Sequence, residues 1–410
     1  MNVMKVASAV KEIVNGDILS PKGFKAAGIH AGLRYSKKDL GIIISDVPAN
    51  SAAVFTTNQF QAAPLKVTQE SLKEGGVLQA VVVNSACANA CTGERGMKDA
   101  YEMRRQTAAA FNLIEHQVAV ASTGVIGEYL PMEKVKKGIL SLTPERTENQ
   151  AEAFQTAILT TDTVMKKCSY SVEIEGGKVV MGGAAKGSGM IHPSMATMLA
   201  FITTDVNITS SALHLALKQA TEHTFNQITV DGDTSTNDMV LVMANGKANQ
   251  TSLTEDHPDW MNFIELLTCT CENLAKQIAR DGEGATKLVE VCVKGAKTNE
   301  DARVIAKQII GSNLVKTAIY GSDANWGRII GAIGQSDVKI STQSVDISIG
   351  TIQMLKKSEP LHFSEEEARA YLLQDTIEII VDLHEGEGIG RAWGCDLSYD
   401  YVKINASYRT

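Results

Sequence analysis

The sequence lacks several features that mark whole classes of protein. It has no extended basic block, and its formal net charge is −8 with a pI near 5.6. Nucleic-acid phosphates require a positive footprint, so no nucleic-acid partner is expected. No hydrophobic run approaches membrane-spanning length, and Lys5, Lys11 and Glu12 interrupt the apolar residues where a signal peptide would need them continuous. We therefore expect no membrane partner and a small polar metabolite as ligand.

The cysteines do not form a recognisable disulfide or metal pattern. There are seven, an odd number, scattered along the chain. The pairs Cys87/Cys91 and Cys269/Cys271 are followed neither by a second pair nor by closely spaced histidines, as a zinc site would require. The sequence predicts a reduced, cytoplasmic protein without a bound metal.

What the sequence does have is length and a mixture of strand-like and helix-like segments. Its 410 residues, 44% of them hydrophobic, exceed what one core normally serves. Strand-like segments at 78–84, 117–123 and 239–245 alternate with amphipathic segments near 100–112, 211–226 and 260–279. This predicts an α/β (α+β) class, although periodicity leaves open whether the sheets are stacked or form one parallel sheet. A further strand, a helix and a Ser364 capping box predict a C-terminal lobe from about 290.

The most informative stretch is KGSGMIHPSMATMLA, residues 186–200. A segment that contains two glycines places one small hydroxyl residue, Thr197, at the start of an apolar run. This placement suits an exposed nucleophile, although a threonine that opens a strand commonly packs or hydrogen-bonds locally.

The segment KGSGMIHPSMATMLAFITTDV resembles the processing segment of the ornithine acetyltransferase (glutamate N-acetyltransferase, ArgJ) family of arginine biosynthesis. In that family the precursor cuts itself between the Ala and the Thr. Further blocks resemble the same family, and they extend over nearly the whole chain: AILTTDT at 157–163, TVDGDTSTNDMV at 229–240, RDGEGATK at 280–287, YGSDANWGRIIGAIGQS at 320–336 and NASYRT at the end.

The resemblance implies a particular fold and assembly. The fold would be a four-layer αββα sandwich of the self-processing aminopeptidase/ArgJ type, with a smaller C-terminal α/β domain. A cut between Ala196 and Thr197 would give an α chain, 1–196, that forms the first part of the sandwich. The β chain, 197–410, would complete the sandwich over about 197–289 and form a C-terminal lobe over about 290–410. Two α and two β chains would then form a heterotetramer.

Cutting the chain would supply the chemistry that a threonine lacks. A new N-terminal amine, with a pKa of about 7.7–8.0 in model peptides, would lie a few bonds from the Thr197 hydroxyl and could take its proton. The same hydroxyl can make the cut by attacking the Ala196 carbonyl, which gives an ester that water then hydrolyses. Gly187 and Gly189 would admit the tight backbone that this attack needs, or they form an ordinary turn.

The remaining site residues follow from matching motifs. The resemblance implies an oxyanion hole formed by Thr123 and Gly124, which sequence alone would assign to a turn at the end of a strand. It implies substrate contacts from a further set: Thr160, Lys186, Thr197, Glu283, Asn405 and Thr410. We expect Lys186 to face the α-carboxylate of N-acetylornithine and Glu283 its ammonium, although without the family each would be assigned to a solvated surface.

The expected reaction is ping-pong transfer of the acetyl group from N-acetylornithine to glutamate through acetyl-Thr197, without a dissociable cofactor. Whether acetyl-CoA also serves as a donor stays open. One alternative is a self-processing N-terminal-threonine aminopeptidase or amidohydrolase, in which water accepts the acyl group. Others are a phosphotransferase centred on Asp231 and a non-catalytic scaffold. His192, near the proposed site, is expected to be a bystander.

Overall fold

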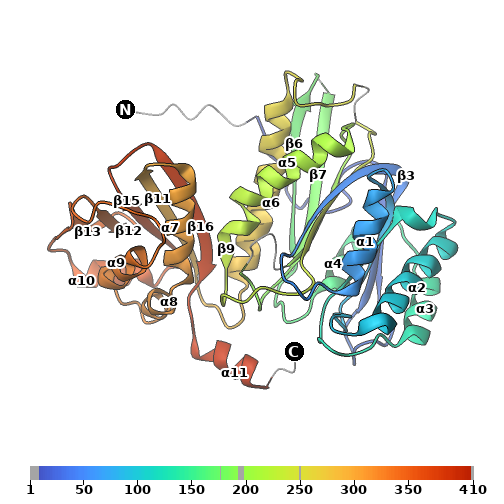
Figure 1. The fold of residues 1–410 in the computed structure, drawn as a ribbon, viewed down its shortest axis with the longest axis horizontal. Helices are drawn as coiled ribbons and strands as arrows, with labels where there is room; N and C mark the ends of the chain where they lie inside the picture. The colour runs from blue at the N-terminus through green and yellow to red at the C-terminus, as the bar shows by residue number, and fades with distance from the viewer. Residues whose placement is uncertain (1–8, 176, 193–197, 249–250, 408–410) are drawn as a thin grey trace.

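A computed structural model describes residues 9–175, 177–192, 198–248 and 251–407. It has two lobes side by side, the larger built from the first two thirds of the chain and the smaller from the last third (Figure 1). In that part of the chain, no helix is both long enough and apolar enough to cross a membrane.

The larger lobe is built on a nine-stranded mixed sheet. Its strands run in the order β1-β6-β7-β8-β10-β3-β4-β5, and β2 pairs with β3 outside this path. Their bounds are β1 Lys11–Glu12, β2 Phe24–Ile29, β3 Leu40–Phe55, β4 Val77–Asn84, β5 Val118–Ser122, β6 Lys166–Ile174, β7 Gly177–Lys186, β8 Leu199–Thr204 and β10 Met239–Ala244.

Strand β3 belongs to both halves of this sheet. Its register with β4 shifts between Ile44 and Ala49, and residues beyond the shift also pair with β10. The irregularity lets the sheet fold back on itself, because a bulge bends the strand that contains it. One hydrogen-bonded sheet therefore supplies two layers.

Side chains alternate between an inner and an outer core, as the pleat requires. On β10, Leu241 joins the inner core with Val81 of β4, whereas the next residue, Val242, faces the helices on the outside. The helices of this lobe are α1 Ala63–Lys73, α2 Gly93–Phe111, α3 Met132–Ser141, α4 Glu148–Ile158, α5 Ser210–His223 and α6 Trp260–Arg280, with short 3₁₀ helices η1 Glu115–Gln117 and η2 Phe225–Gln227.

Helices cover both outer faces of the folded sheet. Helices α5 and α6 cover the half containing β6, β7, β8 and β10, and α1, α2 and α3 cover the half containing β4 and β5. The predicted αββα layering is confirmed.

The smaller lobe has its own sheet and its own core. The sheet order is β14-β13-β12-β15-β11-β16-β9, in which β9 is contributed by the larger lobe. Strand bounds are β9 Ile228–Thr229, β11 Leu288–Ala296, β12 Asp346–Ile349, β13 Ile352–Lys356, β14 Glu359–Pro360, β15 Thr376–Asp382 and β16 Gly388–Cys395. Its helices are α7 Asn299–Gly311, α8 Asn313–Tyr320, α9 Trp326–Gly334 and α10 Glu365–Leu372. The predicted cap is present, since the Ser364 hydroxyl accepts a hydrogen bond from the Glu367 N–H at 3.2 Å.

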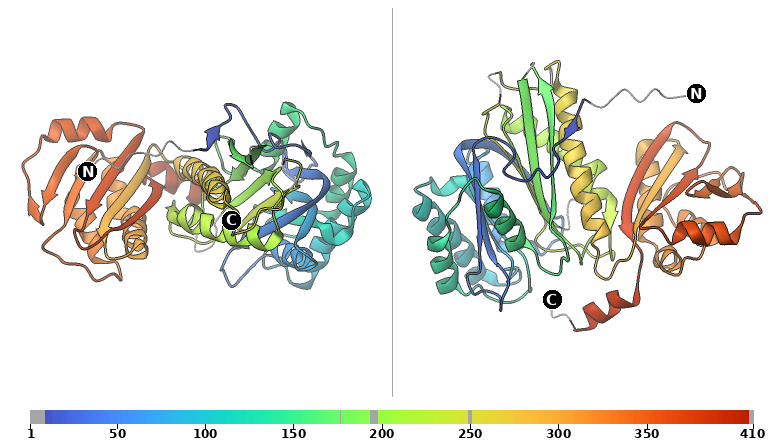
Figure 2. Two further views of the ribbon diagram at one scale, coloured as in Figure 1. Left: turned by 90° about the horizontal axis from the view of Figure 1, so that it is seen from above. Right: turned by 180° about the vertical axis from the view of Figure 1, so that it is seen from behind.

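The last helix, α11 (Tyr399–Ser407), leaves the smaller lobe and lies beneath the junction of the two lobes in Figure 1 and in the right view of Figure 2. It buries none of its residues fully. Its place is therefore set by polar contacts at the junction rather than by a hydrophobic core of its own.

Strands from the two sides of the predicted cut are interleaved. β8 and β10, which follow residue 197, lie between β7 and β3, which precede it. β7 pairs with β8 along its last six residues, and β10 pairs with β3 along its whole length. The two predicted chains thus share the centre of one sheet.

Candidate functional site

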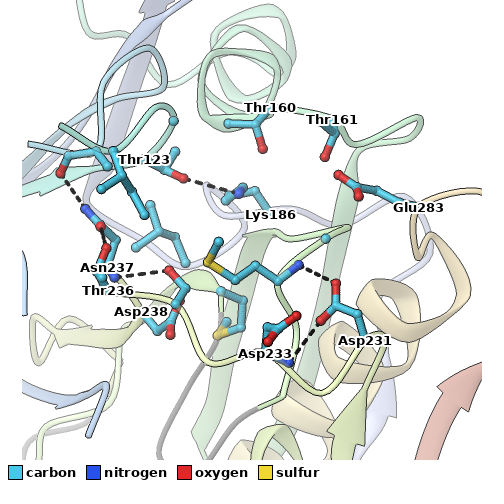
Figure 3. Close-up of a pocket in the computed structure, with 18 of the residues that line it drawn as sticks. Thr123, Thr160, Thr161, Lys186, Asp231, Asp233, Thr236, Asn237, Asp238 and Glu283 are labelled. Atoms are coloured by element: carbon cyan, nitrogen blue, oxygen red, sulfur yellow. Dashed lines mark hydrogen bonds between the residues drawn. The ribbon is translucent and has the colours of Figure 1, made fainter. Parts of the chain in front are cut away.

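A cavity of about 310 Å³ brings together side chains from well-separated segments (Figure 3). Six of the predicted site residues line it: Thr123, Gly124, Thr160, Lys186, Glu283 and Asn405. Met198 and Leu199, which follow the predicted nucleophile directly, line it as well. Ala196, Thr197 and Thr410 lie outside the described residues.

The Thr123–Gly124 turn follows the end of β5. Gly124 has φ +125°, and a Cβ built there would lie 2.2 Å from the carbonyl oxygen of Ala86, so only glycine fits. The Thr123 N–H donates to the carbonyl of Asn84 at 2.9 Å, whereas the Gly124 N–H has no acceptor among the residues that the structure describes. Such an N–H at the rim of a cavity can donate to a ligand oxygen.

Lys186 lies at the end of β7 and points at Thr123. Its Nζ donates to the Thr123 Oγ1 at 3.3 Å (Figure 3). Because this oxygen accepts from an ammonium, the Thr123 hydroxyl hydrogen is available to another acceptor. Burial lowers the pKa of Lys186, while the carboxylates of Asp162, Asp238 and Glu283 act in the opposite direction. The sequence prediction for Lys186 did not include its contact with Thr123.

A buried group of charged side chains lies next to Lys186. The Lys166 ammonium bonds Asp162 at 2.6 Å and Asp281 at 2.5 Å, and all three side chains are almost fully buried. Asp162 also accepts hydrogen bonds from the Thr160 N–H at 2.9 Å and the Gly187 N–H at 2.7 Å. Burial alone would raise the pKa of Asp162, but the Lys166 and Lys186 charges and these bonds hold it well below its usual value. The group therefore fixes two segments of the cavity.

Glu283 and Asn405 meet across the junction of the lobes. The Asn405 side-chain amide on α11 donates to Glu283 Oε2 at 2.8 Å. A Cβ at Gly189 would lie 2.4 Å from the Glu283 carboxylate, so glycine permits this close approach. The Glu283 N–H donates to the Ser188 carbonyl at 3.0 Å. The end of the chain is thereby tied to the loop that precedes the predicted cut.

The structure adds acidic residues that the sequence prediction left out of the site. Asp231 accepts hydrogen bonds from the Met190 N–H at 2.7 Å and the Ile191 N–H at 2.8 Å, and burial raises its pKa. Asp238 also lines the cavity, and its side chain is buried. Both belong to the block TVDGDTSTNDMV, which matches the family but to which the sequence analysis assigns no role in acetyl transfer.

His192 is absent from the residues that line this cavity. Its Nδ1 lies 3.0 Å from the Thr229 hydroxyl, and burial lowers its pKa to about 4, so the ring is neutral at pH 7. Across the described ranges, no three His, Cys, Asp or Glu side chains are arranged to hold a metal ion.

Comparison with known proteins gives consistent matches. The ArgJ family model matches residues 25–410. The arginine biosynthesis bifunctional protein ArgJ of Geobacillus kaustophilus is 68% identical over 410 residues, which cover both chains fully. The protein of that name from Bacillus subtilis is 62% identical over 397 residues, 97% of each chain. A crystal structure of the arginine biosynthesis bifunctional protein from Bacillus halodurans is similar with a TM-score of 0.51 and 62% identity, over 52% of this chain and all of the crystal chain.

Proposed function

The chain belongs to the ArgJ family, and on this premise we propose that it transfers the acetyl group of N-acetylornithine to glutamate through an acetyl ester on Thr197. It is an N-acetyltransferase of arginine biosynthesis. The observation that supports this proposal best is the cavity, where six motif residues from distant parts of the sequence meet beside Met198.

The proposed mechanism begins with a cut between Ala196 and Thr197. One independent comparison supports it: a Bacillus halodurans crystal chain is covered completely by 52% of this chain, and the 214 residues from 197 to 410 make up the same share of 410. The freed amine of Thr197 then takes the proton of its own hydroxyl as that hydroxyl attacks the acetyl carbonyl.

The oxyanion of the tetrahedral intermediate would be bound by the Thr123 hydroxyl and the Gly124 N–H. The hydroxyl is oriented by the Lys186 ammonium, and the N–H has no described competing acceptor. Two fixed donors that need no reorganisation stabilise developing charge better than water does. The nitrogen of ornithine takes the proton from the Thr197 amine and leaves.

The same cavity offers complementary charges to the substrate. We assign the ammonium of N-acetylornithine to Glu283, whose Oε2 is held by Asn405 and whose Oε1 is left for the ligand. Lys186 has three donors and uses one on Thr123, so a substrate carboxylate can take another. Thr160, fixed through Asp162, and Thr410 complete the proposed contacts.

A denaturing gel of the wild-type protein and of Thr197→Ala tests this function. We expect two fragments of about half the chain each from the wild type, and an intact, inactive chain from the variant, because both the cut and the transfer need the hydroxyl. Thr209→Ala, which removes a threonine hydroxyl that caps α5, is the matched control and should be cut normally. A Thr197→Ala protein that matures and transfers acetyl groups at the normal rate would end the proposal.

The alternatives give different results in the same assay. A hydrolase would release ornithine at a rate that does not rise when glutamate is added. A phosphotransferase centred on Asp231 would leave the chain intact, and the structure disfavours it because backbone N–H groups already occupy both carboxylate oxygens of Asp231.

Three finer points belong to the same proposal. We place the reaction in the cytoplasm, with the two pieces of each chain pairing into a heterotetramer, and no cofactor beyond the substrates. Acetyl-CoA as an additional acetyl donor fits the word bifunctional in the relatives' name. Steady-state assays with acetyl-CoA and glutamate, and the native mass in solution, test these points.

A further inference from the structure

Asp238 is a buried carboxyl for which the mechanism above has no use. Its residue is 3% exposed and lines the cavity with Thr123 and Lys186 (Figure 3). Its Oδ2 has no hydrogen-bond partner among the residues that the structure describes. Buried polar atoms are normally paired, because an unpaired one loses its hydration without compensation. An unpaired carboxylate oxygen at a substrate cavity indicates that a donor arrives with the ligand.

Strand pairing places Asp238 at the reacting centre. The N–H of Met239 donates to the carbonyl of Met198 at 2.9 Å, and the parallel pairing of β10 with β8 continues from there. On the other side, the neighbouring Asn237 amide donates to the carbonyl of Ser122 at 2.9 Å, one residue before Thr123. Asp238 thus lies between the residue that follows the nucleophile and the oxyanion donors.

The surroundings of Asp238 shift the pKa of its carboxyl upward from the usual value of an aspartate. Burial is the largest cause, whereas the nearby hydroxyls of Ser235 and Thr56 and the charge of Lys186 act to lower this pKa. The other charged side chains lining the cavity are Asp231, Asp233 and Glu283. A general base works best with a pKa near the working pH.

The reaction needs such a group, because the nitrogen that leaves and the nitrogen that enters both change protonation. Ornithine leaves as a neutral amine and must become an ammonium. Glutamate arrives as an ammonium and must become neutral before its nitrogen can attack. The Thr197 amine carries only the proton that moves between its own hydroxyl and the nitrogen of the substrate. A second group must therefore supply the proton that turns the amine of ornithine into an ammonium and remove the proton from the ammonium of glutamate.

We propose that Asp238 is a further catalytic residue, which gives its proton to the departing α-amine of ornithine and takes one from the incoming α-ammonium of glutamate. This inference rests on the proposed function. Asp238 starts as the acid and becomes a carboxylate when it protonates the released neutral amine of ornithine to the ammonium. It returns to the acid when it takes a proton from glutamate. The neutral nitrogen of glutamate then forms a bond to the acetyl carbon, and the bond between that carbon and the Thr197 oxygen breaks. The glutamate nitrogen loses one proton, which the Thr197 amine passes to the Thr197 oxygen.

A comparison of two acceptors tests Asp238 directly. Hydroxylamine is already neutral at neutral pH, so it can take the acetyl group without a base, whereas glutamate cannot. We expect Asp238→Asn to be cut normally. Once its Thr197 carries the acetyl group, the variant should transfer that group to hydroxylamine at close to the wild-type rate and to glutamate about 100-fold or more slowly, as single-turnover measurements on the acetylated protein would show. Glutamate transfer should recover as the pH approaches the pKa of glutamate's own ammonium. Equal loss for both acceptors, or for neither, would overturn the assignment.

Two further variants keep the test decisive. Asp205→Asn, a buried aspartate that accepts N–H bonds from Lys22 and Val180 away from the cavity, should leave the ratio of the two rates unchanged. If Asp238→Asn does not fold, Ser235→Ala keeps the carboxyl but removes a nearby hydroxyl that lowers its pKa. The acid limb of glutamate transfer should then move to higher pH while that of hydroxylamine stays, and an unmoved glutamate limb would refute the role of Asp238.

The same assays separate this inference from the function beneath it. If the wild-type protein releases no ornithine from N-acetylornithine, the proposed function fails and Asp238 has no reaction to serve. If the wild type is active and only the acceptor comparison fails, the transferase stands and the role of Asp238 does not.

Discussion

The proposed role of Thr123 in the oxyanion hole depends on the geometry of a single side chain. Its hydroxyl accepts from the Lys186 ammonium and so has its own hydrogen to give to the oxyanion. Thr123→Val keeps the shape but removes this donor, and kcat should fall by about 10²- to 10³-fold. Thr123→Ser, which keeps the hydroxyl, is the control. Single-turnover release of ornithine measures the effect, and an unchanged rate would remove Thr123 from the oxyanion hole.

At this scale the sequence predicted the residues better than their contacts. Motif matching identified six of the residues that line the cavity, because each short polar motif can be matched by itself wherever it lies in the sequence. It did not predict that Lys186 contacts Thr123, since a contact between β7 and the turn after β5 depends on how the sheet folds. Asp238 lies within a block that matches the family, but the sequence does not show that its carboxyl is buried at the cavity.

At the scale of elements, the buried ion group fixes the ends of β6, β7 and α6 relative to one another. Asp162→Asn leaves the Lys166 ammonium with less compensation in a dry environment, and we expect a loss of about 3–5 kcal/mol in unfolding free energy at pH 7. Measuring urea unfolding in the uncut Thr197→Ala background keeps the equilibrium within one chain. Asp400→Asn, which breaks an exposed ion pair with Lys403, should cost almost nothing.

The pH dependence of that loss follows from the sign of the shift. The pKa of Asp162 is lower in the folded protein than in the unfolded chain, so its stabilisation is fully present above the unfolded pKa of about 3.9. It is lost as the pH falls towards the folded pKa. The stabilities of Asp162→Asn and its parent should therefore converge below about pH 4, and a constant difference would contradict this assignment.

Strands with a run of apolar residues were predictable from the sequence, whereas the path of a strand that belongs to two layers of the sheet was not. The segments predicted at 78–84 and 239–245 correspond to β4 and β10, because each contains a run of buried apolar residues. The sequence could not predict that the 16-residue β3 would pass from one layer to the other. Its shift of register with β4 is a tertiary feature, and hydrophobic periodicity reports only which residues are buried.

At the scale of the whole molecule, α11 connects the smaller lobe to the cavity. Deleting residues 405–410 removes the Asn405 bond to Glu283 but no residue of either hydrophobic core. We expect the melting temperature to stay close to that of the full chain while kcat/KM for N-acetylornithine falls about tenfold or more, as for a lost hydrogen bond to a charged group. Deleting 408–410 alone separates the contribution of the last three residues, which include Thr410, from that of Asn405. Full activity of the longer deletion would exclude a role for this tail.

The interleaving of β8 and β10 between β7 and β3 has a consequence for the life of the cut protein. The uncut precursor assembles this sheet within one molecule, where the neighbouring strands are tethered and meet at high effective concentration. After the cut the tether is gone, so a denatured sample can recover only when two separate pieces collide, and its yield must depend on dilution. If the chain is cut as proposed, the protein folds once as a single chain, and the cut form then persists because it unfolds slowly and not because it refolds readily.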